Sequence, residues 1–158
     1  MSAPAAAETV VVRAADPDAT TRLGRALGAV ARAGDLVCLW GDLGAGKTHL
    51  AKAFGAALGV TDTITSPTFI LMAEYEGRLR LFHVDPYRLA SAEDALAGGL
   101  LDERQRDGVT LVEWPERLGN ALPAARLDVR IEDVGDQVRV ITLVARSLTY
   151  QRFLEAVG

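Results

Sequence analysis

The chain has 158 residues, of which 49% are hydrophobic and 24% are charged, and its formal net charge is −4 at pH 7. This length and composition predict one globular domain with a real core, and the apolar runs are too short for a membrane-spanning helix of about 20 residues. The acidic balance excludes a large basic face that binds nucleic acid by itself.

The single cysteine and the first residues of the chain indicate where the protein is located in the cell. Cys38 is the single cysteine, which excludes an internal disulfide, argues against a zinc site and favours a small buried hydrophobe. Residues 1–12 lack the basic start of a secretion signal, so we expect a cytoplasmic protein. We expect the Ala-rich residues 1–7 to form a disordered tail and residues 8–158 to form a single domain.

Two elements precede the first glycine-rich loop. Glu8 to Arg13 is rich in valine and predicts a strand. Asp16 to Thr20 carries the N-cap and first-turn signals of a helix. Hydrophobic residues recur at helical spacing from Leu23 to Val30, so this helix is expected to end near Ala33-Gly34.

The most informative motif is G-D-L-G-A-G-K-T, which matches the phosphate-binding pattern G-x-x-x-x-G-K-[ST]. Residues 36–40 before it predict a buried strand and residues 49–58 after it predict a helix, so both flanks agree with the motif. The glycines let backbone N–H groups approach phosphate oxygens at the start of that helix. The motif predicts triphosphate binding by Gly41, Asp42, Leu43, Gly44, Ala45, Gly46, Lys47 and Thr48.

Two residues of the motif carry specific chemistry. Lys47 would reach the β- and γ-phosphates, and the Thr48 hydroxyl would sit on Mg²⁺. The chain has no N-K-x-D sequence, which would indicate guanine specificity, so adenine is the better prediction. ATP and Mg²⁺ are therefore the expected cofactors.

The second half of the chain is rich in predicted strands. Turn residues at Glu76-Gly77 and Gly135-Asp136 each predict an antiparallel hairpin. The elements expected here are strands at Phe69–Tyr75 and Leu79–Val84, a short helix at residues 91–101, and strands at Val109–Val112, Leu127–Ile131 and Val138–Ala145.

Hydroxyl groups mark the loop before the first of these strands. Ser66 and Thr68 belong to the sequence S-P-T-F at residues 66–69. They either approach the γ-phosphate or its metal, as switch loops do, or belong to an ordinary turn.

Carboxylates follow two of the predicted strands. Asp85 and Glu113 stand where a Walker B acid acts on Mg²⁺ or its water shell. Asp85 could instead cap a turn before Pro86, and His83 could be a satisfied core histidine. Trp114 either stacks on a purine base or packs in the core.

Together these motifs resemble the TsaE (YjeE) family, small bacterial ATPases of tRNA threonylcarbamoyladenosine biosynthesis. The motifs at residues 41–48, S-P-T-F at 66–69, H-x-D-x-Y-R at 83–88 and E-W at 113–114 occur in the family's order and at its spacing. The resemblance implies an α/β fold of P-loop NTPase type, with a mixed, mainly parallel sheet, β-hairpins and few flanking helices. Residues 8–158 would then be a single P-loop ATPase domain.

The resemblance also implies roles for the candidate residues. Lys47, Asp85 and Glu113 would be catalytic, with Asp85 as a Walker-B-like acid that orients water or the metal shell. Thr48 and Glu113, with Asp85 nearby, would hold Mg²⁺. Further nucleotide contacts would come from Ser66, Thr68, Trp114, Asp16 near the first helix and Arg139 in the last hairpin.

The implied function is hydrolysis of ATP to ADP and phosphate, slow in isolation, in partnership with the TsaB–TsaD pair that transfers threonylcarbamoyl to the adenosine beside the tRNA anticodon. The chain would be a monomer when alone, would contact tRNA only through that complex, and would not contact a membrane. His49 and Trp40 depart from the residues expected of the family at these positions. A nucleotide-dependent binding switch with little hydrolysis and a small-molecule kinase remain as alternatives, because a phosphate loop indicates binding and not turnover.

Overall fold

A seven-stranded sheet in the order β1-β7-β6-β2-β5-β4-β3 organises the residues that the computed structural model describes, which are 7–42, 44–64, 72–86 and 103–158. The strands are β1 (Glu8–Ala14), β2 (Leu36–Trp40), β3 (Met72–Tyr75), β4 (Arg80–Val84), β5 (Gly108–Glu113), β6 (Leu127–Gly135) and β7 (Val138–Ala145). The α-helices are α1 (Pro17–Ala29), α2 (Lys47–Ala57) and α4 (Gln151–Val157). Short 3₁₀ turns lie at Glu103–Asp107, Pro115–Arg117, Gly119–Ala121 and Leu148–Tyr150.

The centre of the sheet is parallel and its two sides are antiparallel. β2 pairs in parallel with β5 and β6, and β4 pairs in parallel with β5. The hairpins β3–β4 and β6–β7 are antiparallel, as is the pairing of β1 with β7. The expected mixed sheet with β-hairpins and few helices is confirmed, with its parallel part confined to the strands β6, β2, β5 and β4.

Several predicted features lie outside the described residues. These are the helix at residues 91–101, the beginning of the strand at Phe69–Tyr75, and the candidate site residues Leu43, Ser66 and Thr68. Among the helices in the described ranges, none has the length and apolar composition needed to span a bilayer.

Helix α1 ends earlier than its sequence predicts. It stops at Ala29 and not near Ala33-Gly34. The guanidinium of Arg78 donates to the carbonyl of Gly28 at 2.8 Å and to that of Ala31 at 3.2 Å. Because a helix end leaves carbonyl groups without helical partners, this distant arginine satisfies acceptors that another turn would otherwise use.

The C-terminal helix α4 was not predicted, and its stability comes from tertiary packing. It has seven residues, too few for a clear helical period. Phe153 and Leu154 are buried, and the Phe153 ring stacks on Tyr150 with ring centroids 5.9 Å apart. The Tyr150 hydroxyl accepts a hydrogen bond from the backbone N–H of Leu36 at 2.8 Å, which ties this end of the chain to β2.

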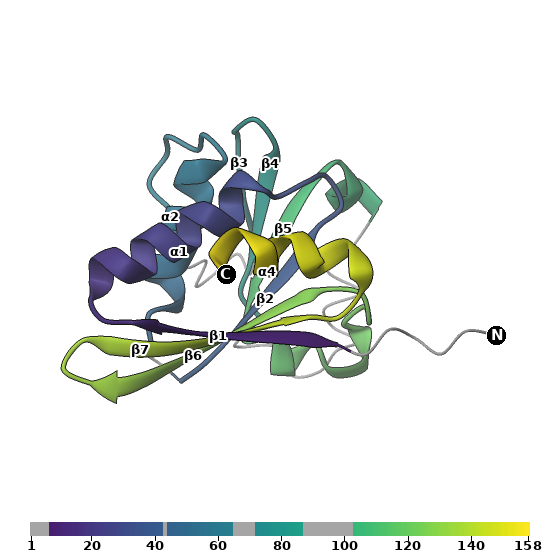
Figure 1. Ribbon diagram of the computed structural model, residues 1–158. Coiled ribbons are helices and arrows are strands. Elements are labelled where there is room, and N and C mark those ends of the chain that lie inside the picture. Colours follow the sequence, from purple (N-terminus) through teal and green to yellow (C-terminus); the bar gives the residue numbers. More distant parts are fainter. Residues whose placement is uncertain (1–6, 43, 65–71, 87–102) are drawn as a thin grey trace.

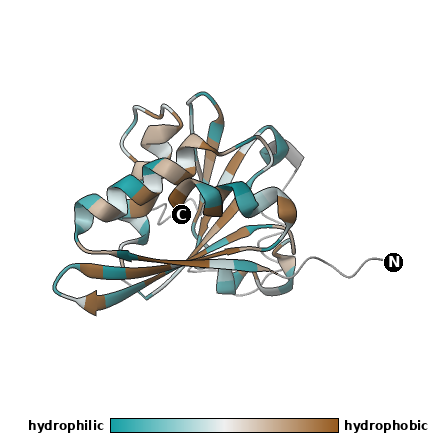
Figure 2. Cartoon of the chain, viewed as in Figure 1, coloured by the Kyte–Doolittle hydropathy of each residue, from teal (hydrophilic) through white to brown (hydrophobic). Residues whose placement is uncertain are grey.

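Helices α1, α2 and α4, the three α-helices of the described residues, cover one face of the sheet (Figure 1). Side chains alternate along β2, so Val37 and Leu39 face the helices, whereas Leu36 and Cys38 join a smaller cluster on the other face. Cys38 is fully buried, as expected, and this burial raises the pKa of its thiol. Hydrophobic residues, drawn in brown, are frequent along the strands, and α1 alternates between hydrophobic and hydrophilic residues (Figure 2).

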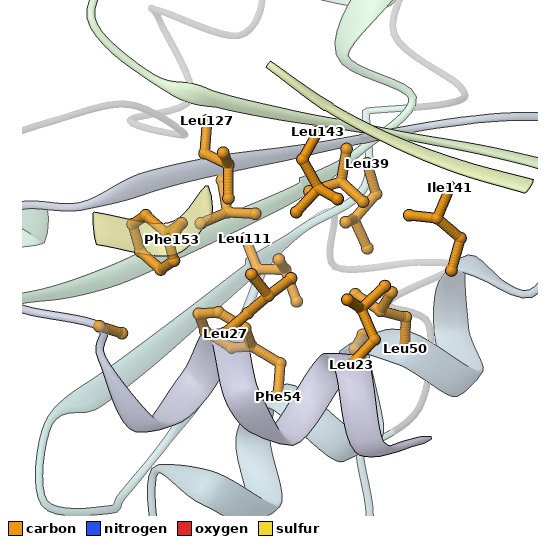
Figure 3. Packing of buried hydrophobic residues seen from close by; sticks show 14 of the residues in the cluster. Leu23, Leu27, Leu39, Leu50, Phe54, Leu111, Leu127, Ile141, Leu143 and Phe153 are labelled. Carbon is orange, nitrogen blue, oxygen red and sulfur yellow. The ribbon is translucent and has the colours of Figure 1, made fainter. Parts of the chain in front are cut away.

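The main core lies between the helices and the sheet (Figure 3). Each fully buried leucine or phenylalanine contributes roughly 1.5–3 kcal/mol through the hydrophobic effect. The residues that meet in Figure 3 include Leu23 and Leu27 of α1, Leu50 and Phe54 of α2, Leu39, Leu111, Leu127, Ile141 and Leu143 of the sheet, and Phe153 of α4.

Helices α1 and α2 pack side by side and run in the same direction. A side chain on Gly28 would place its Cβ 2.4 Å from the carbonyl oxygen of Phe54, so only glycine allows this approach. Toward the N-terminal ends of both helices, Thr21 of α1 contacts His49 of α2. The beginning of α1 therefore lies beside the beginning of α2.

Candidate functional site

The glycine-rich loop connects the end of β2 to the beginning of α2. Gly41, Gly44 and Gly46 have positive φ angles of 153°, 82° and 110°, which residues with a side chain rarely adopt. A Cβ on Gly41 would also lie 2.6 Å from the carbonyl oxygen of Ile131. The loop thus follows a tight path against β6 that requires glycine.

Helix α2 begins directly after this loop without a side-chain cap. Its N-cap residue is Gly46, which makes no capping side-chain hydrogen bond. The first N–H groups of a helix lack partners within the helix, and its positive dipole end attracts anions. Loop and helix start together present the geometry that phosphate groups bind.

Lys47 is buried and turned back across the loop. Only 5% of it is exposed, and its Nζ donates to the Gly41 carbonyl at 2.8 Å. Burial lowers the pKa of Lys47, an effect that the nearby carboxylates of Glu113, Glu116, Asp85 and Asp42 oppose. This desolvated ammonium is suited to an anionic ligand, because phosphate would replace the hydration that it lacks.

Trp114 lies at this site and not in the core. Its indole ring is 3.5 Å, centroid to Nζ, from the ammonium of Lys47, a cation–π contact. Its backbone is left-handed, with φ 53° and ψ 50°, a conformation that costs a bulky residue about 1–3 kcal/mol. Whether the ring also stacks on a base stays a prediction.

Glu113, at the end of β5, contacts side chains from the two neighbouring elements α2 and β4. The hydroxyl Oγ1 of Thr48 lies 3.3 Å from its Oε1 and 3.5 Å from its Oε2. The imidazole Nε2 of His83 lies 2.6 Å from Oε2. All three side chains reach this point because β4, β5 and α2 meet at the carboxyl edge of the parallel strands.

Asp85 follows β4 at the position that lies beside Glu113 on the adjacent strand β5. Val84 pairs with Val112, so the residues that follow them on the two parallel strands are neighbours. Asp85 is buried, and its charge acts on Lys47. The structure therefore brings together four predicted site residues: Lys47, Thr48, Asp85 and Glu113.

The oxygen groups of this cluster fit Mg²⁺. Mg²⁺ prefers hard oxygen ligands, and it usually takes one or two from the protein and the others from phosphates and water. The Thr48 hydroxyl and the Glu113 carboxylate supply such oxygens side by side. No group of three or more histidine, cysteine or acidic side chains that could hold a metal occurs within the described ranges, so an all-protein cage is not what these residues build.

Arg139 and Asp16 differ in how they relate to the loop. The Nε of Arg139 donates to the Ala45 carbonyl at 2.7 Å, so this β7 residue reaches the phosphate loop. Asp16 is the N-cap of α1, and its Oδ1 accepts from the N–H of Ala19 at 2.8 Å. This hydrogen bond caps helix α1, so Asp16 has a structural role. The nucleotide contacts of Asp16 and Arg139 stay predictions.

A cavity of about 170 Å³ lies beside the start of α2. The β6–β7 turn and the beginning of α1 lie at the same end of the molecule (Figure 1), and both contribute to its lining. Its lining residues are Pro17, Thr20, Gly46, His49, Gln137 and Arg139. A second cavity, of about 470 Å³, adjoins the loop on the side of β6 and includes Asp42 and Glu132.

Two histidines of the site were not assigned from the sequence. His83 was interpreted as a core residue, and it is fully buried, yet its Nε2 faces a candidate metal ligand. The signal was available, because residues two apart on a strand share a face and His83 precedes Asp85 by two. His49 lines the cavity, and its Nε2 lies 3.2 Å from the Pro17 carbonyl and 2.9 Å from the Thr21 hydroxyl.

Comparisons of sequence agree on one group of relatives. Residues 14–141 match the family described as Threonylcarbamoyl adenosine biosynthesis protein TsaE. The tRNA threonylcarbamoyladenosine biosynthesis protein TsaE of Bacillus subtilis (strain 168) is 39% identical over 144 residues, which are 90% of each chain. The protein of that name from Treponema pallidum (strain Nichols) is 41% identical over 124 residues, 78% of this chain and 92% of its own.

A solved structure shares the fold. The crystal structure of YdiB from Bacillus subtilis matches with a TM-score of 0.78 and 34% sequence identity. The match covers 95% of this chain and 94% of that one. The fold is therefore shared with a solved bacterial protein along almost the whole of both chains.

Proposed function

The chain belongs to the TsaE family of threonylcarbamoyl adenosine biosynthesis proteins, and we propose that within tRNA threonylcarbamoyladenosine biosynthesis it binds and hydrolyses ATP. One observation carries this proposal. A phosphate loop, its buried Lys47, and a Thr48 hydroxyl 3.3 Å from the Glu113 carboxylate meet at the same edge of the sheet. This combination supplies three of the parts that phosphoryl transfer uses, which are a phosphate cradle, a lysine and oxygen ligands for a metal ion.

The loop and Lys47 would bind the phosphates. Backbone N–H groups between Gly41 and Thr48 would donate to phosphate oxygens, and the Lys47 ammonium would leave the Gly41 carbonyl to reach the β- and γ-phosphates. Both interactions lie in a partly dry site, where charge stabilisation is strong.

Thr48 and Glu113 would hold Mg²⁺, and Asp85 would orient the attacking water. Bound there, Mg²⁺ would neutralise negative charge on the β- and γ-phosphate oxygens. Asp85 is buried beside Glu113, which shields its carboxylate from bulk water and would keep it near the phosphates of a bound nucleotide. That water would form a bond to the γ-phosphorus while the bond from the γ-phosphorus to the oxygen shared with the β-phosphate breaks, which releases inorganic phosphate and leaves ADP.

The adenosine would occupy the cavity lined by His49 and Arg139. This cavity adjoins Gly46 at the start of α2, so a nucleotide with its phosphates in the loop could extend into it. Its remaining lining comes from the start of α1 and from the β6–β7 turn, which explains why no single sequence motif marks it.

The functional unit would be a complex with a TsaB–TsaD pair, and contact with tRNA would be indirect. In this structure Lys47 is held by the Gly41 carbonyl and the Trp114 ring. That arrangement supports slow hydrolysis by the isolated chain, with partner contact needed to complete the site. It also makes a binding switch with little hydrolysis the second candidate function.

Measurement of ADP release, with and without the TsaB–TsaD pair, tests the proposal. We expect slow release alone, faster release in the complex, and a loss on the order of 100-fold for Glu113→Gln. Glu155→Gln on α4 is the matched control, because Glu155 is exposed and belongs to neither the loop nor the candidate site. ATP binding without ADP release in either setting would favour the binding switch, and full turnover by Glu113→Gln would remove the metal assignment.

A further inference from the structure

His83 is a polar residue in an apolar position. It lies on β4 with none of its surface exposed. Its neighbour on the same face is Leu81, and its partner on β5 is Leu111, both of which belong to the main core. A leucine would satisfy this position by packing alone, so the imidazole needs another explanation.

Its only polar contact within the described part of the chain is Glu113. The distance of 2.6 Å from Nε2 to Oε2 is that of a short hydrogen bond, and a carboxylate oxygen can only accept, so Nε2 donates. Its Nδ1 is buried and finds no hydrogen-bond partner among the described residues. Burial of an unpaired polar group costs about 1–3 kcal/mol, which the bond to the carboxylate offsets.

This bond restricts how Glu113 presents its oxygens. His83 holds Oε2 from the β4 side, while the Thr48 hydroxyl approaches both carboxylate oxygens from α2. The sheet fixes the spacing, because β4 and β5 are paired in register up to Val84 and Val112. The carboxylate is therefore held between two donors from different elements and cannot rotate freely.

We propose that His83 is a positioning residue that orients the Glu113 carboxylate for Mg²⁺ beside Thr48. The proposal rests on the proposed function, because it assigns Glu113 to the metal. A side chain that forms a hydrogen bond to a metal ligand fixes the orientation of that ligand. Loss of such a side chain typically weakens metal affinity by about 10–100-fold.

The Mg²⁺ requirement for nucleotide binding is the first test. Binding of a non-hydrolysable ATP analogue is titrated at a series of Mg²⁺ concentrations and in EDTA. We expect His83→Leu to raise the half-saturating Mg²⁺ concentration about 10–100-fold while the affinity in EDTA is unchanged. His83→Gln, which keeps a side-chain N–H donor, should recover part of the loss.

Two comparisons separate positioning from packing. Phe82→Leu changes a buried residue on the opposite face of the same strand and should leave the Mg²⁺ requirement unchanged. In a Glu113→Gln background, His83→Leu should add no further loss, since the ligand it orients is already altered. An unchanged Mg²⁺ requirement in His83→Leu, an equal rise in Phe82→Leu, or additive losses in the double variant would each overturn the proposal.

A spectroscopic test does not depend on a folded His83 variant or on activity. The chain has two histidines, so the imidazole N–H signals of ¹⁵N-labelled protein are few. We expect a slowly exchanging Nε2–H signal from His83 that shifts in Glu113→Gln, and an unaltered signal would contradict the contact. If the wild-type protein bound ATP without any dependence on Mg²⁺, the proposed function would fail, whereas this signal would still test the His83–Glu113 bond.

Discussion

Glu113 and Asp128 are both buried carboxylates at the sheet, yet their surroundings differ. Glu113 is 3% exposed and Asp128 is 5% exposed. Glu113 lies at the helix-covered face, at the end of β5, whereas Asp128 pairs in register with Cys38 and lies toward the other face. The difference between them separates a carboxylate that stabilises the fold from one to which we assign a role in metal binding.

The charge of Asp128 is compensated within the fold. Its oxygens accept from Trp40 Nε1 at 2.8 Å, Arg126 Nε at 2.9 Å and Arg146 Nε at 2.6 Å. Burial acts to raise the pKa of Asp128, but these three hydrogen bonds outweigh it and hold the pKa below its ordinary value. A carboxylate with two arginine partners has little capacity left for a cation from solution.

The charge of Glu113 is compensated only in part. Its partners are the His83 imidazole and the Thr48 hydroxyl, and among the described residues no lysine or arginine forms an ion pair with it. Lys47 is near, but its ammonium is turned toward Gly41 and Trp114. The comparison teaches that the degree of charge compensation, more than burial, distinguishes a site for an incoming cation from a structural bond.

The largest effect is expected for Lys47→Ala, because it removes the cation that we assign to the triphosphate. ATP turnover should fall by about 100- to 1,000-fold, as it does on loss of one preorganised donor in an active site, and ATP affinity should fall as well while the fold persists. ADP release measures the turnover, isothermal titration the affinity and circular dichroism the fold. Lys52→Ala is the matched control, since Lys52 is exposed on α2, and unchanged ATP affinity in a folded Lys47→Ala protein would remove the phosphate-loop assignment.

Asp128→Asn should lower stability without touching the site. It removes a buried charge and leaves Arg126 and Arg146 without their carboxylate. Because Arg146 is 44% exposed, water replaces part of the interaction, and we expect a loss of about 1–3 kcal/mol. Urea denaturation measures the loss, and an unchanged free energy of unfolding, or a large fall in ATP affinity, would reverse the roles given to the two carboxylates.

Asp128 should also make stability depend on acid pH. Its pKa is lower in the folded than in the unfolded state, so its contribution is present above the unfolded pKa of about 3.9 and is lost as pH falls toward the folded pKa. The free energies of unfolding of the wild type and Asp128→Asn should therefore converge as pH is lowered from 7 to 3. Curves that stay parallel over this range would show that the pKa of Asp128 is not depressed.

The smallest effect concerns Trp114. If ATP draws Lys47 away from the indole ring, the fluorescence of Trp114 should change on ATP addition. Trp40→Phe isolates the signal, although it removes a donor to Asp128, so spectra are recorded well below the unfolding temperature of this variant. A silent Trp114 in a variant that binds ATP would mean that Lys47 does not leave the ring.

The parts of the site that were predicted depend on local pattern. The strand, glycine loop and helix around Lys47 follow directly from residue order, and Asp85 and Glu113 follow from strand ends at the edge of a parallel sheet. Both predictions need only the order of residues along the chain and the assumption of a parallel sheet, and not the identity of the neighbouring strands.

The parts that were missed depend on contacts between distant segments. Arg78 donates to the Gly28 carbonyl at the end of α1 from 50 residues away, and helix α4 depends on packing of its own two buried residues. The His83–Glu113 bond requires the register of β4 with β5, and the contact of Trp114 with Lys47 requires a left-handed backbone at a bulky residue. The spacing of His83 and Asp85 places both on one face of β4, but no pattern along the chain gives their partners, because each of these contacts joins segments whose spacing is set by the tertiary fold.

The thermal shift produced by Mg²⁺ and ATP tests the central comparison most directly. A ligand at 100 times its Kd adds about 2.7 kcal/mol to the stability of a folded protein, so one melting experiment reports both fold and site. Glu113→Gln should melt like the wild type without ligand and lose the Mg²⁺-dependent part of the shift. Asp128→Asn should melt at a lower temperature without ligand and keep the full shift. The opposite pattern, a Glu113→Gln protein with a normal shift or an Asp128→Asn protein without one, would contradict the assignment of Glu113 to the metal and Asp128 to the fold.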